Sequence, residues 1–384
     1  MQDKGITKEE LQAELDQIKA LDMEYESGRI ISSMCTQPHP IAKEVFNQFF
    51  ESNLGDPGLF KGTSATEKKV IKQLGQLLHL EKSYGTMVTG GTEANLMAMR
   101  AARNMARLDK GITHPEIIVP PTAHFSFKKA EDILGLKIIE SDVDENYRIN
   151  TETLEEKITP NTVAIVAIAG TTELGRIDPI EEIGKIASKH NIYLHVDAAF
   201  GGFIIPFLDD YDFPEFDFKI NAVSSITLDP HKMGLAPIPA GCIIFRDKKS
   251  LDSMDVDTPY LTCKNQATIV GTRSGATVMA TYALLRYLGR EGYREIAHEA
   301  MQNTFFFADE LQKLGFQLSS KVKLNIVSFS HPKIPLNTLQ EELTKRGWAP
   351  SVSKYPKSIR IVIMPHIKRE HIIDLINDLK EIIG

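Results

Sequence analysis

From Ser83 to Asp247, short apolar runs alternate with stretches that have helical periodicity. Runs that are apolar throughout are typical of strands covered on both faces, and the helical stretches supply the crossovers that parallel strands need. The alternation therefore predicts an α/β fold with a mostly parallel, seven-stranded sheet. The seven runs lie at 83–90, 116–121, 137–142, 162–170, 192–199, 222–229 and 241–247. The last follows its predecessor without a helical crossover, so it is expected to be antiparallel.

The pattern changes after about Gly275. A long helical stretch at 276–314 precedes two short strand-like runs, at 324–330 and 359–364, and a terminal helix at 371–383. Because 384 residues exceed a single core of usual size, more than one domain is expected. We predict an N-terminal helical segment (1–50), a large domain (51–275) and a smaller C-terminal α+β domain (276–384).

Charge and composition exclude several classes of partner. The net charge is -7, from 44 basic and 51 acidic residues without long runs of one sign, which predicts no nucleic-acid partner. The strongest apolar run, Val163–Ala169, is far shorter than a membrane span of about 20 residues. Cys35, Cys242 and Cys263 are too few and too scattered for a disulfide framework or a zinc site. We expect a cytoplasmic protein without a metal.

A lysine, Lys232, follows an apolar run and a Pro-His turn in the segment SSITLDPHKMG. This places it at the carboxyl end of a strand, where ligands of open α/β sheets bind. A lysine sheltered from water there becomes a usable amine nucleophile. Taken alone, a His-Lys pair would fit a solvated turn better, and the neighbouring segments decide between the two interpretations.

An aspartate, Asp197, ends the apolar run IYLHVDAA. A buried carboxylate needs a partner, and a protonated pyridine nitrogen would be one. A helix cap or a metal ligand is the alternative, but no ligand cluster with metal spacing accompanies it.

Two further segments stand at strand ends. Thr89–Asn95 (TGGTEAN) joins a strand to a helix, and its glycines and free N–H groups suit a phosphate, although Thr92 is also a good N-cap. The second, Pro120–Ser126, contains His124, which either stacks on a planar ligand or satisfies a loop. Because all of them stand at strand ends, the phosphate loop, the stacking histidine, the aspartate and the lysine would lie around one crevice. Pyridoxal 5′-phosphate requires this combination.

On these residues the chain resembles the fold-type I pyridoxal-phosphate transferase-like enzymes, and among them the group II amino acid decarboxylases. It is most similar to the archaeal L-tyrosine/L-aspartate decarboxylase family, and the resemblance extends from about Gly28 to Ile383. The strings that carry it are SMCTQPHPIA (33–42), NLGDPGLFKGT (53–63), DPHKMGLAP (229–237), TIVGTRSGA (268–276) and IRIVIMPHI (359–367).

The resemblance implies roles for individual residues. Lys232 would attach the cofactor, with His231, Gly91 and Thr92 at its phosphate. His124 and Ala199 would lie on the two faces of the ring, Asp197 at its nitrogen, and Thr172 near its oxygen substituent. Thr272 would reach the phosphate of a neighbouring subunit, which implies a homodimer with shared active sites. Arg360 would hold the substrate carboxylate.

Tyr260, in the polar segment DVDTPYLTC, lies 28 positions after Lys232. Group II decarboxylases carry a catalytic tyrosine on a mobile loop at similar spacing, where it protonates the intermediate after carbon dioxide leaves. The resemblance implies this role for Tyr260, whereas its sequence alone fits an ordinary loop tyrosine as well.

The amino acid substrate is less constrained. Asp56, Phe60 and Lys61 are expected near the side-chain pocket, where Phe60 would pack on an aromatic substrate and Lys61 would pair with a second carboxylate. Decarboxylation of L-tyrosine would give tyramine for methanofuran, and that of L-aspartate would give β-alanine for coenzyme A. L-glutamate decarboxylation, a carbon–carbon lyase of the sphingosine-phosphate lyase type, and a non-catalytic dimeric scaffold are the alternatives.

Overall fold

The computed structural model describes residues 1–384 and contains the predicted seven-stranded sheet. Its spatial order is β1-β7-β6-β5-β4-β2-β3. β7 runs antiparallel to both neighbours and the remaining adjacent pairs are parallel, as expected. The strands are β1 (Tyr84–Val88), β2 (Glu116–Val119), β3 (Lys137–Glu140), β4 (Thr162–Ile168), β5 (Tyr193–Asp197), β6 (Val223–Leu228) and β7 (Gly241–Phe245).

Both faces of this sheet are covered, which explains why its central strands are apolar throughout. Along β4, Ile165 joins one buried cluster and Val166 joins another, because successive side chains point to opposite faces. α4 covers the second face, and α3, α7 and α9 supply residues to the first cluster. The helices of this part are α3 (Lys61–Leu77), α4 (Gly91–Lys110), α5 (Ser126–Leu134), α6 (Thr151–Leu154), α7 (Ile180–Lys189), α8 (Lys248–Asp252) and α9 (Gly275–Tyr287).

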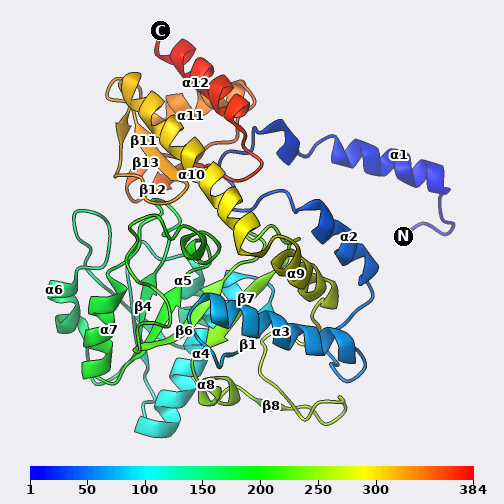
Figure 1. The fold of residues 1–384 in the computed structure, drawn as a ribbon, viewed down its shortest axis with the longest axis vertical. Coiled ribbons are helices and arrows are strands. Elements are labelled where there is room, and N and C mark those ends of the chain that lie inside the picture. Colours follow the sequence, from blue (N-terminus) through cyan, green and yellow to red (C-terminus); the bar gives the residue numbers. More distant parts are fainter.

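A second, antiparallel sheet with the order β10-β11-β13-β12 occupies the C-terminal part. Its core is a separate cluster around Phe307, Phe329 and Trp348, and α10 runs from the large sheet to this small one (Figure 1). The elements are α10 (Gly289–Lys313), β10 (Gln317–Leu318), β11 (Ile326–Ser330), α11 (Leu336–Lys345), β12 (Ser351–Lys354), β13 (Lys357–Val362) and α12 (Arg369–Ile383). These observations fit the expected small α+β domain, whose exact limits stay a prediction.

The N-terminal residues form α1 (Lys8–Lys19) and α2 (Pro40–Gln48). α2 packs against α9, whereas α1 buries none of its residues and stands away from the rest of the chain (Figure 1). A short hairpin, β8 (Val256–Asp257) and β9 (Asn265–Gln266), lies in the loop before α9. Four 3₁₀ turns complete the fold: η1 (Tyr25–Ser27), η2 (Glu155–Lys157), η3 (Gly201–Phe203) and η4 (Ile205–Phe207). None of the helices has the length and apolar character needed to cross a bilayer.

Candidate active site

A cavity of about 260 Å³ opens at the carboxyl ends of β4, β5 and β6. This is the edge where a parallel α/β sheet binds ligands. Eight of the residues expected at the cofactor line it: Gly91, Thr92, His124, Thr172, Asp197, Ala199, His231 and Lys232. The sequence had placed them on five separate segments, and the fold brings them together.

The N-terminus of α4 forms one wall of this cavity. Gly90 precedes the helix and no side chain caps it, so the N–H groups of the first turn face the cavity without a side-chain partner. A Cβ at Gly91 would lie 2.9 Å from Asp229 Oδ2 and 3.2 Å from the Ala199 Cβ, which leaves room for glycine alone. This wall can hold a phosphate.

Asp197 lies at the end of β5 and is buried. Its Oδ2 accepts a hydrogen bond from Asn95 Nδ2 at 2.8 Å, and its Oδ1 accepts one from the Ala199 N–H at 3.0 Å. No ion pair includes this carboxylate. Two neutral donors leave lone pairs free on both oxygens, so Asp197 can accept the N–H of a pyridinium ring.

The two cavity histidines are held in neutral forms by burial. Burial lowers the pKa of His124, whose Nδ1 accepts from the Ser126 N–H at 3.2 Å, so its proton sits on Nε2. Burial also lowers the pKa of His231, whose Nδ1 accepts from the Ala240 N–H at 3.0 Å. Each therefore offers the cavity a neutral imidazole.

Lys232 Nζ lies 3.2 Å from Asp229 Oδ2, and its side chain is only 17% exposed. Two other buried polar atoms of the cavity lining, Asp229 Oδ1 and Thr122 Oγ1, have no hydrogen-bond partner. Buried polar atoms are normally paired, so this cavity has unused capacity for a polar ligand. An amine, a carboxylate, neutral imidazoles and a helix N-terminus are the donor set that pyridoxal 5′-phosphate fits.

Six expected residues do not line this cavity, and one of them, Lys61, is the first residue of α3. Arg360, on β13, lies behind its wall, with Nη1 donating to Thr172 O at 2.9 Å and Nη2 to Ser32 O at 2.7 Å. Tyr260 is 86% exposed, and Phe60 lines a separate hollow beside Phe49 and Phe50.

The other two residues lie on paired loops. Asp56 Oδ1 accepts from the Thr262 N–H at 3.1 Å, and a Cβ on Gly55 would lie 2.9 Å from the Thr272 Cα. The segment 53–61, which was expected near the substrate side chain, and the segment 256–273 around Tyr260 (the Tyr260 loop) therefore run side by side, outside the cavity of their own chain.

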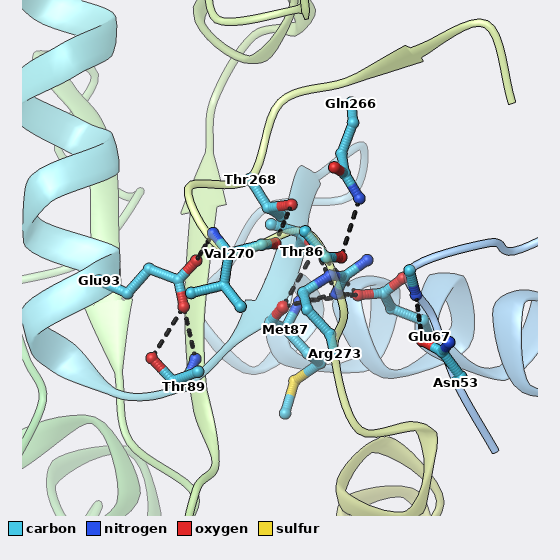
Figure 2. Close-up of polar contacts among 12 residues, drawn as sticks. Asn53, Glu67, Thr86, Met87, Thr89, Glu93, Gln266, Thr268, Val270 and Arg273 are labelled. Atoms are coloured by element: carbon cyan, nitrogen blue, oxygen red, sulfur yellow. Dashed lines mark hydrogen bonds and ion pairs between the residues drawn. The ribbon is translucent and has the colours of Figure 1, made fainter. Parts of the chain in front are cut away.

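Figure 2 shows contacts between the segment that follows Tyr260, here Gln266 to Arg273, and residues of α3, β1 and α4. The Glu93 carboxylate, in the first turn of α4, accepts from Thr89 N and Oγ1, both at 2.8 Å, and from the Val270 N–H at 3.1 Å. Arg273 pairs with Glu67 and donates to Met87 O at 2.7 Å. Glu93 thus joins the phosphate loop to the Tyr260 loop.

Several lining residues had no role assigned from the sequence, among them the polar residues Asn95, Thr122 and Asp229. Asn95 had a detectable signal, because it lies four residues after Gly91 and therefore one helical turn away on the same face. Thr122 and Asp229 lay within the motifs that were recognised, but nothing in those motifs marked their side chains.

Comparisons with known proteins agree with this geometry. The model of the pyridoxal-dependent decarboxylase conserved domain matches residues 63–331. The chain is 57% identical to a probable L-tyrosine/L-aspartate decarboxylase of Methanothermobacter thermautotrophicus, over 94% of this chain and 99% of the relative. It is 48% identical to the L-aspartate decarboxylase of Thermococcus kodakarensis, over 99% and 98%.

Among solved structures, a sphingosine-1-phosphate lyase of Burkholderia pseudomallei superposes with a TM-score of 0.93 at 26% identity, over 100% of this chain and 92% of that one. This confirms the expected fold. The chain belongs to the pyridoxal-dependent decarboxylase family and is a pyridoxal 5′-phosphate-dependent carboxy-lyase that acts on an amino acid.

Proposed function

We propose that this protein decarboxylates L-tyrosine to tyramine, L-aspartate to β-alanine, or both. The proposal depends on one observation: Lys232, Asp197 and His124 line the same cavity. The names of the relatives that are 57% and 48% identical support these two substrates.

In the proposed site, Lys232 attaches the cofactor through its amine, and Gly91, Thr92 and His231 hold the phosphate. Bound pyridoxal 5′-phosphate supplies a ring that accepts the electron pair left when the carboxylate departs. Asp197 keeps the ring nitrogen protonated. His124 and Ala199 fix the plane of the ring, while Thr172 lies near its oxygen substituent. Arg360 binds the substrate carboxylate with its remaining donors: three of its five N–H groups are used within the chain, and two are left for a ligand.

We further propose a homodimer in which the Tyr260 loop, Thr272 and the Asp56–Lys61 loop reach the cavity of the partner subunit. The support is that these loops are paired with each other and do not line the cavity of their own chain. Tyr260 then closes over the site and supplies the proton after carbon dioxide leaves, and Asp56, Phe60 and Lys61 contact the substrate side chain.

Mixed dimers test the shared site. Lys232→Ala and Thr272→Arg are each expected to inactivate the enzyme, but a mixture that exchanges subunits forms heterodimers with one intact site. A random mixture should therefore recover about a quarter of the parental activity. No recovery after verified subunit exchange would contradict sites that are shared between subunits.

The substrate is identified by incubating the purified enzyme with L-tyrosine, L-aspartate and L-glutamate in parallel and measuring released carbon dioxide. We expect release from tyrosine or aspartate, and release from glutamate alone would replace the proposal. A second candidate, carbon–carbon cleavage of a phosphorylated amino alcohol, is favoured only by the fold shared with the Burkholderia lyase. Aldehyde formation without carbon dioxide would support that candidate.

The three cysteines are free, which fits a reducing cytoplasm as the proposed location. In such a cell tyramine would serve methanofuran synthesis and β-alanine would serve coenzyme A synthesis.

A further inference from the structure

Asn95, a buried amide in α4, uses every hydrogen-bonding position that its side chain has. Its Nδ2 donates to Asp197 Oδ2 at 2.8 Å and to Ser126 Oγ at 3.0 Å. Its Oδ1 accepts from Thr227 Oγ1 at 2.8 Å and lies 3.0 Å from His195 Nε2. An amide has two N–H donors and two acceptor lone pairs, so none is left over.

The surroundings allow only one orientation of this amide. The Asp197 carboxylate can only accept, so the Asn95 NH₂ faces it and Asn95 Oδ1 faces His195 Nε2. The imidazole proton is therefore on Nε2, and Ser225 Oγ, 2.8 Å from His195 Nδ1, donates to that nitrogen. A flipped amide would direct its NH₂ at two donors and its carbonyl at the Asp197 carboxylate. His195 and Thr227 therefore fix the amide so that it donates to Asp197.

The network is also uncharged. Complete burial lowers the pKa of His195 to about 4, so the imidazole is neutral near pH 7. The groups that face it, Asn95, Ser225 and Thr227, are neutral as well. The carboxylate is thereby positioned without a cation that would compete for its charge.

The Asn95 amide is also connected, through Ser126, to His124. Ser126 Oγ accepts the other N–H of Asn95, and the Ser126 N–H donates to His124 Nδ1 at 3.2 Å. One side chain thus connects the carboxylate proposed for the ring nitrogen with the imidazole proposed for the ring face.

We infer that Asn95 is a positioning residue that sets Asp197 and the His124 loop relative to each other, while His195 and Thr227 orient its amide. The inference rests on the proposed function, because it assumes that a pyridinium ring lies between these two groups. Asn95, together with His195 and Thr227, would thus help Asp197 to keep the ring nitrogen protonated.

The test uses Asn95→Leu, which keeps the size of the side chain and removes all four hydrogen bonds. Pyridoxal 5′-phosphate affinity of the apoprotein is measured by titration, and the ring nitrogen of the bound, ¹⁵N-labelled cofactor is observed by NMR. We expect affinity to fall about tenfold or more, the usual effect of losing a hydrogen bond to a charged group, and the nitrogen signal to move toward the unprotonated form. Parental affinity and a parental signal would overturn the inference.

Thr227→Val provides a second variant, because Thr227 does not line the cavity and the hydrogen bonds of its hydroxyl reach Asp197 only by way of Asn95. The substitution keeps the backbone pairing of Thr227 with Asp197 between β6 and β5. It should weaken cofactor affinity in the parent and have no further effect in the Asn95→Leu background, a coupling that a purely structural role would not produce. Thr281→Val, at a buried threonine bonded within α9, is the matched control and should leave affinity unchanged.

If Asn95→Leu fails to fold, unchanged affinity in Thr227→Val overturns the inference on its own. A parental protein that binds no pyridoxal 5′-phosphate would instead refute the proposed function, so the two failures are distinguishable.

Discussion

At the scale of single residues, the cavity depends on Lys232 and the carboxylate beside it. Asp229 pairs with the lysine through Oδ2 and leaves Oδ1 without a partner. The amine is therefore held near the cavity by one contact and is shielded from bulk water. This is the environment in which a lysine is free to react with a carbonyl group.

Lys232→Ala should remove the visible absorbance of the cofactor from the purified protein, because no other lysine lines the cavity. Absorbance spectra before and after incubation with pyridoxal 5′-phosphate measure this. Lys219→Ala is the control, since that exposed lysine pairs with Glu215 at the surface. A Lys232→Ala protein with the parental colour would rule out the attachment.

Lys232, Asp197 and His124 were predictable because each follows an apolar run, and parallel strands end at one edge of the sheet. The position of Asn95 one helical turn after Gly91 was detectable, but its role was not, because that role depends on partners 31 to 132 positions away that only the folded chain brings together. Thr272 and Tyr260 illustrate a second limit: the sequence indicates the loop on which a residue stands, but packing decides which cavity it approaches.

At the scale of elements, Asp178 joins β4 to the segment that precedes α6. It is fully buried, and its two oxygens accept from the Ile149 N–H at 2.9 Å and the Ile168 N–H at 2.7 Å. Burial raises its pKa to about 7 in spite of these donors. The folded protein therefore binds this proton more tightly than the unfolded chain does.

Because the folded pKa is raised, the contribution of Asp178 to stability is complete below the unfolded value near 3.8 and is lost as the pH rises through about 7. We expect this contribution to make the free energy of unfolding of the parent fall as the pH rises from about 4 to about 7, and the fall to be smaller in Asp178→Asn. The variant should also lose about 1–3 kcal/mol throughout, since its NH₂ faces a backbone donor. Urea unfolding at several pH values measures both effects, and parallel profiles would contradict the assignment.

The contacts of Glu93 make a prediction for the Tyr260 loop. In Glu93→Gln one carboxylate oxygen becomes an NH₂ group, which cannot accept a hydrogen bond, so the side chain can keep its bonds to Thr89 or its bond to Val270 but not both. The loop at 256–271 should then be cleaved several-fold faster in limited proteolysis, while the far-ultraviolet circular dichroism is unchanged.

Glu182→Gln, at an exposed glutamate in the first turn of α7, is the matched control and should be cleaved at the parental rate. Equal cleavage of both variants would show that Glu93 does not retain the loop.

The long helical stretch at 276–314 shows which element boundaries were missed. It forms α9 and α10, separated at Gly289, where φ is +59° and the helix cannot continue. The glycine was visible in the sequence, but helical periodicity on both sides concealed the break. The small strands β10 and β12 were also missed, because two to four residues carry too little pattern.

At the scale of the whole molecule, α1 is capped at its N-terminus, but none of its residues is buried. Thr7 and Glu10 form a capping box, but the apolar residues Leu11, Leu15 and Ile18 remain exposed. An isolated helix of 12 residues is marginal in water, so this one needs a surface to cover its apolar side. In the proposed homodimer that surface belongs to the second subunit.

Leu15→Glu should therefore weaken self-association about tenfold or more without unfolding the protomer, since a buried leucine contributes roughly 1.5–3 kcal/mol. Sedimentation over a range of concentrations measures the dissociation constant. Leu108→Glu, at an exposed leucine near the end of α4, is the control and should not change it. Identical behaviour of the two variants would remove α1 from the contact.

The hydrogen bonds of the Arg360 guanidinium restrict how the C-terminal part can move. It bonds to Ser32, Thr172 and Ser351, and so fastens the small sheet and the N-terminal segment to the rim of the cavity. A swing of the C-terminal part as a rigid body would have to break the bonds to Thr172 and Ser32, whereas Ser351 lies on the neighbouring strand and would move with Arg360. We therefore expect small molecules to enter and leave past short surface segments, without a rigid-body swing of the C-terminal part.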